Sequence, residues 1–230
     1  METLTGKREE LDERGARVVA DAIAGLLEAQ PFVVLGVVGG RSVSGIYHRL
    51  AALDLSWPRI HVFLADERLV PITSDESNWK LVRADLLVRP LETGAMPAAN
   101  AHAFEFDASK PDAGVSRYTK ALAAVGGRFD IAVLSAGEDG HCASLFPNHP
   151  SVADEGEHFI VVEGSPKPPP RRISASRRLL ERTRVGLMCF YGEDKRAALG
   201  RFRDPALDVQ GCPSKVVTKL ERGYLLTDLV

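Results

Sequence analysis

Short, nearly uninterrupted apolar runs constrain the fold of this chain more than any other feature of its sequence. The clearest run is FVVLGVV at 32–38, which leads directly into a glycine pair. Related runs occur at 60–65 (IHVFLA), 129–135 (FDIAVLS), 159–163 (FIVVE) and 185–191 (VGLMCFY). Strands without polar alternation are typical of parallel sheets that are covered on both faces. We therefore predict that these segments are strands, mainly of one parallel sheet.

Segments with helical periodicity alternate with these strands. At 18–27, apolar residues recur three and four positions apart, and further helices are expected within 39–53, 77–87, 115–125 and 193–199. This alternation predicts an α/β fold, a mainly parallel sheet with helices on both faces, arranged as a Rossmann-like three-layer sandwich. A chain of 230 residues can bury one substantial core, so we predict a single domain over its whole length.

Composition and charge narrow the possible partners. Hydrophobic residues make up 45% of the chain and charged residues 26%, with a formal net charge of −2, as in an ordinary globular protein. The basic pairs Arg171-Arg172 and Arg177-Arg178 lack interleaved aromatic side chains, so no nucleic-acid partner is expected. The charged start of the chain and the lack of an apolar run of about 20 residues predict a cytoplasmic protein with no membrane partner.

Three unusual loops, at 39–44, 66–68 and 137–141, directly follow predicted strands. In α/β folds, the loops at the carboxyl ends of parallel strands converge on one crevice, where ligands bind. The three loops are therefore expected to share a functional site.

The first of these loops has features of an anion site. Gly39 and Gly40 let backbone N–H groups approach a ligand closely, and Ser42 adds a hydroxyl at the start of a helix, which suits a phosphate. The loop matches neither of the common glycine-rich nucleotide motifs. A tight turn with a serine cap explains it about equally well, so both interpretations stay open.

The second loop places Asp66 and Arg68 on the same side of an extended segment, with Glu67 facing away. Arg68 could then donate two hydrogen bonds to a carbonyl or hydroxyl pair in the crevice. An ion pair at the surface is the alternative interpretation.

The third loop, GEDGH at 137–141, suits acid–base chemistry. Its glycines bracket the acidic pair and expose His141, whose imidazole can take a proton from water near neutral pH, and Asp139 could orient that ring. The H-x-x-x-H spacing of a zinc site is absent, so no metal is expected. A capping aspartate beside a solvent-facing histidine is the alternative.

Two cations further along the chain suit an anionic ligand. A polyproline run precedes Arg172 and delivers its guanidinium rigidly, and Lys195 lies in a predicted helix. Arg172, Lys195 and the first loop are predicted to neutralise one phosphate together, although either cation alone is typical of surface charge.

The unusual loops extend into longer motifs: Gly39-Gly40 with Ser42, ADERLVP at 65–71 followed by Ser77-Asn78, GEDGHCASLFP at 137–147, PPPRRIS at 168–174 and GEDKRAAL at 192–199. In this order, they resemble the 6-phosphogluconolactonase family, part of a wider group that includes glucosamine-6-phosphate deaminase. The resemblance covers most of the chain. The family commonly reads G-G-S-T-P where this chain has GGRSV, so Arg41 could add to the phosphate donors.

The resemblance implies hydrolysis of 6-phospho-D-glucono-1,5-lactone to 6-phospho-D-gluconate in the oxidative pentose phosphate pathway, without a cofactor. It implies that His141 is the general base that activates water, that Asp139 helps to organise the polar site, and that Arg68 holds substrate near its carbonyl. The substrate-binding residues that it implies are Gly39, Gly40, Ser42, Asp66, Asn78, Arg172 and Lys195, of which Ser42, Arg172 and Lys195 receive the phosphate.

Two other functions stay open. In glucosamine-6-phosphate deaminases, a further carboxylate typically stands at the position of Phe146, and the loss of that acid–base group favours the lactonase. A sugar-phosphate sensor that binds without turnover is the second alternative, and the intact His141 and Asp139 argue against it. The expected assembly is a monomer or a small homo-oligomer.

Overall fold

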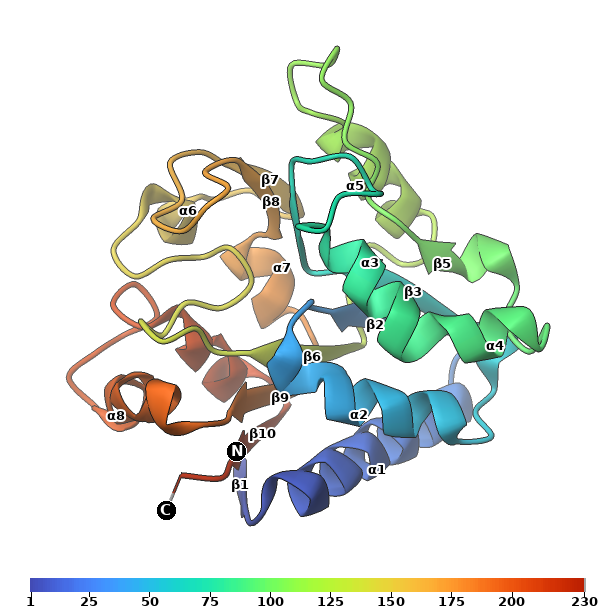
Figure 1. Ribbon diagram of the computed structural model, residues 1–230, viewed down its shortest axis with the longest axis horizontal. Coiled ribbons are helices and arrows are strands. Elements are labelled where there is room, and N and C mark those ends of the chain that lie inside the picture. The colour runs from blue at the N-terminus through green and yellow to red at the C-terminus, as the bar shows by residue number, and fades with distance from the viewer. Residues whose placement is uncertain (230) are drawn as a thin grey trace.

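The computed structural model describes residues 1–229, and within them the chain forms a seven-stranded parallel sheet and a three-stranded antiparallel sheet. In spatial order, the strands of the large sheet are β1 (Glu2–Thr5), β10 (Arg222–Thr227), β9 (Val185–Phe190), β6 (Ile131–Ser135), β2 (Val33–Val37), β3 (Ile60–Leu64) and β5 (Ala101–His102). The small sheet consists of β4 (Asp66–Arg68), β8 (Arg172–Ala175) and β7 (Phe159–Val162). The pairing of β1 with β10 places the N-terminus beside the last strand (Figure 1).

The helices alternate with the strands of the large sheet. The α-helices are α1 (Arg8–Leu27), α2 (Arg41–Ala52), α3 (Asn78–Val82), α4 (Val88–Glu92), α5 (Val115–Ala123), α6 (Pro150–Ala153), α7 (Arg177–Glu181) and α8 (Arg196–Arg203). A π-helical turn, η2 (Arg83–Leu87), joins α3 to α4, and the 3₁₀ helices are η1 (Trp57–Arg59), η3 (Ala98–Asn100), η4 (Glu193–Lys195) and η5 (Pro213–Lys219).

Nowhere within residues 1–229 does a helix have the length and apolar character needed to cross a membrane.

Helices cover both faces of the large sheet, which confirms the predicted α/β fold. On one face α1 lies beside α2 (Figure 1), and Gly15 of α1 permits this approach, because a Cβ there would lie 2.9 Å from the side chains of Ile46 and Leu226. Gly223 stands three residues before Leu226 in β10 and therefore points to the opposite face. On that face, a Cβ at Gly223 would lie 2.4 Å from the carbonyl oxygen of Val217 in η5.

The small sheet is the main difference from the predicted arrangement. The segment predicted as a strand at 159–163 forms β7, but β7 pairs antiparallel with β8. A turn through the proline run joins these two strands without a crossover helix, and only antiparallel neighbours can be joined so directly. The strands β1, β4, β5, β8 and β10 lie outside the predicted segments, because they are short or polar residues interrupt their apolar pattern.

The parallel topology brings the functional loops to one edge of the large sheet. The strands β9, β6, β2 and β3 are consecutive neighbours, so the segments that follow their carboxyl ends lie next to one another. The strand β1 ends at the same edge and leads into α1, so the start of α1 also lies at this edge.

Candidate active site

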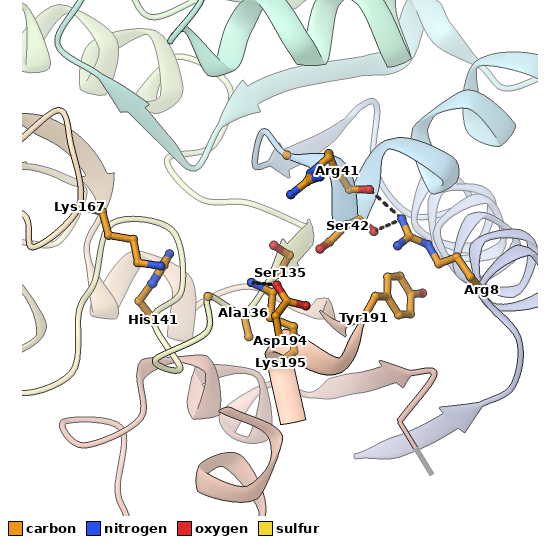
Figure 2. Close-up of a pocket in the computed structure, with 12 residues that line it drawn as sticks. Arg8, Arg41, Ser42, Ser135, Ala136, His141, Lys167, Tyr191, Asp194 and Lys195 are labelled. Atoms are coloured by element: carbon orange, nitrogen blue, oxygen red, sulfur yellow. Dashed lines mark hydrogen bonds and ion pairs between the residues drawn. The ribbon is translucent and has the colours of Figure 1, made fainter. Parts of the chain in front are cut away.

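Two adjoining cavities lie at the carboxyl edge of the large sheet. The larger has a volume of about 460 Å³ and the smaller a volume of about 70 Å³. Ser135, at the end of β6, and His141 line both cavities, so the imidazole lies at their junction. Figure 2 shows His141 and Lys167 at one end of the larger cavity and Arg8 and Tyr191 at the other. All three of the predicted loops contribute to these walls.

The loop at 137–141 holds the ring of His141 in one orientation. Nδ1 of His141 lies 2.6 Å from Oδ1 of Asp139, and the same oxygen accepts the backbone N–H of His141 at 3.1 Å. The ring packs on Phe146 with 4.8 Å between the ring centroids. It also lies against Gly137, where a Cβ would be 1.9 Å from Cε1 of the imidazole. A carboxylate, an aromatic ring and a glycine together define the position of this side chain.

The charge of Asp139 determines the tautomer of His141. Burial raises the pKa of Asp139, but the hydrogen bond and charge of His141, together with the charge of Lys167, hold that pKa well below its usual value. Asp139 is therefore ionised at neutral pH and can only accept a hydrogen bond. Nδ1 of a neutral His141 must then carry the proton, which leaves a free lone pair on Nε2. The ring is set up to take a proton from a molecule in the cavity.

Asp66, Arg68 and Asn78 line the smaller cavity. The buried carboxylate of Asp66 accepts hydrogen bonds from Oγ of Ser144 at 2.8 Å and from Nδ2 of Asn78 at 3.2 Å. Arg68 donates to the carbonyl oxygen of Glu76 at 2.5 Å, but its Nε is buried without a hydrogen-bond partner among residues 1–229. Buried donors are almost always paired, so an unpaired N–H on a residue that lines the cavity is a candidate donor to a ligand.

The glycine pair shapes the boundary between the two cavities. Gly39 lines the smaller cavity, and a Cβ there would lie 2.4 Å from Oδ1 of Asn78. Gly40 has a φ of 127° and brings the first turn of α2, with Arg41 and Ser42, onto the wall of the larger cavity. The first turn of a helix has free N–H groups and favours negative charge. This wall of the larger cavity is therefore suited to an anion.

Side chains from three other segments add positive charge to the larger cavity. Lys195 precedes α8, with 15% of its side chain exposed and Nζ 3.7 Å from Asp194. Lys167 comes from the loop between β7 and β8, and Arg8 comes from the start of α1. No motif surrounds Arg8, so sequence reasoning missed it, and only the pairing of β1 with β10 brings it to the site. Clustered cations beside a helix start suit a phosphate.

The structure separates two cations that the sequence analysis groups around one phosphate. Arg172 lines the smaller cavity, whereas Lys195 and Ser42 line the larger one. The guanidinium of Arg172 donates to the backbone carbonyls of 167–169 at 3.0 to 3.2 Å and lies 5.6 Å from the centroid of Phe146. These contacts hold it near His141, which differs from the predicted placement beside Lys195.

Glu67 faces away from both cavities and caps the helix that carries Asn78. Its buried carboxylate accepts the backbone N–H of Asn78 at 2.7 Å, that of Trp79 at 2.8 Å and the hydroxyl of Ser77 at 2.9 Å. Burial raises the pKa of Glu67, and these hydrogen bonds offset part of that effect. Sequence reasoning assigned no role to Glu67. The only sequence signal for this role was that an acidic residue stands ten positions before Ser77, where the Ser-Asn pair begins a helix.

Replacing Glu67 with alanine should lower the free energy of unfolding by about 3 kcal/mol, because several donors lose their acceptor inside the protein. Urea unfolding followed by circular dichroism measures this loss. The matched control is Glu76→Ala, at an exposed position, for which we expect a change of less than about 0.5 kcal/mol. An equal loss in both variants would contradict the capping role.

The site combines an oriented imidazole with a cation-lined cavity, and it lies at the carboxyl edge of a parallel sheet. An α/β protein with such a site is suited to a small phosphorylated ligand. Among the residues that the structure describes, there is no group of three or more His, Cys, Asp or Glu side chains that could hold a metal ion. The model of the family described as glucosamine-6-phosphate isomerases/6-phosphogluconolactonase matches residues 6–226, and the chain belongs to this family.

Relatives and solved structures agree with this family. The 6-phosphogluconolactonase of Caulobacter vibrioides is 32% identical over 212 residues, which cover 89% of this chain and 88% of that protein. The crystal structure of 6-phosphogluconolactonase from Thermotoga maritima superposes with a TM-score of 0.82 at 25% identity, covering 98% of this chain and 97% of that one. A monomeric glucosamine-6-phosphate deaminase has the same TM-score of 0.82 at 19% identity and covers 100% of this chain and 98% of that one, which shows the shared fold alone.

Proposed function

We propose that this protein hydrolyses 6-phospho-D-glucono-1,5-lactone to 6-phospho-D-gluconate, in the oxidative pentose phosphate pathway. The names of its relatives support this function. The observation that carries it is the position of His141 at the junction of a cation-lined cavity and a small polar cavity. A phosphoryl group in the first and a lactone carbonyl at the junction would place the ester bond beside Nε2.

The reaction needs one water molecule and one base. Nε2 of His141 accepts a proton as water attacks the lactone carbonyl, and Asp139 stabilises the imidazolium that forms. The imidazolium then returns the proton to the departing ring oxygen, which stays tethered to the product. A δ-lactone is an activated ester, so this mechanism requires no covalent nucleophile.

Negative charge that develops on the carbonyl oxygen needs donors. Arg68 lines the small cavity, its guanidinium is held by the hydrogen bond to the carbonyl oxygen of Glu76, and its Nε has no partner among residues 1–229. Donors that are already in place cost little reorganisation when the charge appears. We assign Arg68 the role of donor to the carbonyl oxygen. We assign Asp66 the role of holding Asn78 and Ser144 in position around this cavity.

The phosphoryl group is assigned to the larger cavity, where Lys195 lies across from Arg41 and Ser42 (Figure 2). Contacts far from the reacting carbon orient the lactone and contribute to lowering the barrier. Arg172, at the other cavity, is assigned to the sugar end of the substrate rather than to the phosphate.

A specific observation favours the lactonase over the amino-sugar deaminase. Phe146 is buried, with 1% of its surface exposed, and its ring packs on His141, so an aromatic ring occupies the place where the deaminase resemblance calls for a carboxylate. Ring opening and proton transfer beside two sugar carbons need such an additional acid–base group.

A pH-stat assay tests the proposal. Purified protein should release acid from the phosphorylated lactone faster than the spontaneous reaction, without added metal. Ammonia release from glucosamine 6-phosphate in place of lactone hydrolysis would favour the deaminase. Tight binding of 6-phosphogluconate with neither reaction would favour the sensor. The single domain, the cytoplasmic location and the monomeric or small homo-oligomeric state stay predictions.

A further inference from the structure

Arg8 lies at the larger cavity but belongs to none of the motifs that define the site. It is the first residue of α1, and it lines the cavity together with Ser42 and Lys195. Its side chain is 31% exposed, and Figure 2 shows its guanidinium beside Ser42 and Tyr191. Arg8 can therefore stabilise the local structure, bind a ligand in the cavity, or do both.

The hydrogen bonds of Arg8 leave one edge of the guanidinium free. Nε donates to the carboxylate of Asp12 at 3.0 and 3.1 Å. Nη2 donates to the carbonyl oxygens of Arg41 at 2.7 Å and of Ser42 at 2.9 Å. These bonds use three of the five N–H donors of the guanidinium. The two donors on Nη1 have no partner in the part of the chain that the structure describes.

The surroundings of Arg8 hold this free edge in place. Asp12 is 5% exposed and lies so close to α2 that a Cβ on Gly45 would be 1.9 Å from its Oδ2. The Arg8 guanidinium lies over the ring of Tyr191, with Cζ 4.2 Å from the centroid. A guanidinium held on one edge and one face loses little freedom when a ligand binds the other edge.

Arg8 also joins the two walls that carry the other anion-binding groups. Its Nη2 contacts reach the first turn of α2, and Tyr191 stands four residues before Lys195 on the opposite wall. Arg8 therefore contacts both walls, and it lines the cavity between them with two unpaired donors.

We propose that Arg8 binds the phosphoryl group of the substrate directly through Nη1, while Nη2 holds the first turn of α2 in the binding position. The proposal rests on the assignment of phosphate to the larger cavity, made under the proposed function. It adds a ligand-binding residue from a segment outside all of the family motifs in this chain.

The test compares ligands with and without the phosphoryl group. In Arg8→Gln, calorimetry should show about a 10- to 100-fold weaker affinity for 6-phosphogluconate, because a charge-assisted hydrogen-bonding pair is lost. The kcat/KM for the phosphorylated lactone should fall by a similar factor, whereas the kcat/KM for unphosphorylated glucono-1,5-lactone should stay unchanged. Arg8→Lys, which keeps the charge but cannot form the fork, should give an intermediate loss. The matched control is Arg17→Gln, on the exposed side of α1.

Several outcomes would overturn the proposal. An unchanged affinity for 6-phosphogluconate in Arg8→Gln would show that Arg8 does not touch the ligand. An equal loss of kcat/KM with both lactones would show that Arg8 acts only through the structure of α2. If Arg8→Gln does not fold, Arg8→Lys decides by the same comparison of the two lactones. If the wild-type protein hydrolyses neither lactone, the proposed function fails, and the affinity for inorganic phosphate in wild type and Arg8→Lys still decides the role of Arg8.

Discussion

Replacing His141 with alanine should lower kcat for lactone hydrolysis by about a thousandfold, within the range that a general base contributes. The loss follows from the geometry: Asp139 holds Nδ1, and Nε2 is the free base at the junction of the two cavities. Initial rates in a pH-stat measure the loss, and circular dichroism checks that the fold is kept. The affinity for 6-phosphogluconate should change little, because the residues that we assign to the phosphoryl group do not include His141.

The control for this variant is His48→Ala. His48 lies on α2, its side chain is 60% exposed, and its Nε2 contacts Asp85 at 3.1 Å, so it shares the residue type but neither cavity. We expect full activity from this variant. A His141→Ala protein that kept more than a tenth of the wild-type rate would show that another group activates the water.

Replacing Gly137 with alanine should lower kcat by about a hundredfold, although the substitution adds only a methyl group. A Cβ at this position would lie 1.9 Å from Cε1 and 2.0 Å from Nδ1 of His141, so the imidazole cannot keep its present position. Displacement of a reacting group by about 1 Å can cost about a hundredfold in rate. The measurement is the initial rate with the phosphorylated lactone, together with thermal unfolding of the variant.

The matched control for Gly137→Ala is Gly25→Ala in α1, where a Cβ would meet no atom within 4 Å. Alanine in a helix is favoured over glycine, so this variant should be fully active and as stable as the wild type or more so. A fully active Gly137→Ala protein would mean that the exact place of the ring is not important, which would weaken the assignment of His141 as the base.

Much of the fold could be predicted because its signals are local. The run at 32–38 and its counterparts at 60–65, 129–135 and 185–191 become β2, β3, β6 and β9, since strands buried on both faces cannot carry alternating polar residues. The strand at 159–163 was also found, but its partner was not. Pairing depends on how the following turn directs the chain, and a short proline turn leads to an antiparallel neighbour.

The site could be predicted only in part. The loops of the three main motifs lie at the two cavities, and His141 contacts Asp139, because the carboxyl ends of parallel strands meet at one edge. The predicted grouping of Arg172 with Lys195 differs from the structure. A guanidinium on a flexible side chain can turn to either side, and the carbonyl groups of 167–169 decide its direction.

The order of residue types along the chain determined that this protein has a parallel α/β fold, with an imidazole, a carboxylate and glycine-rich turns after its strands. Apolar periodicity and turn chemistry depend on near neighbours, so they can be read without coordinates. Only the tertiary structure decided that the site has two cavities, that Glu67 caps the helix carrying Asn78, and that Arg8 reaches the larger cavity. Those relations join residues far apart in the chain, and packing and strand pairing alone bring such residues together.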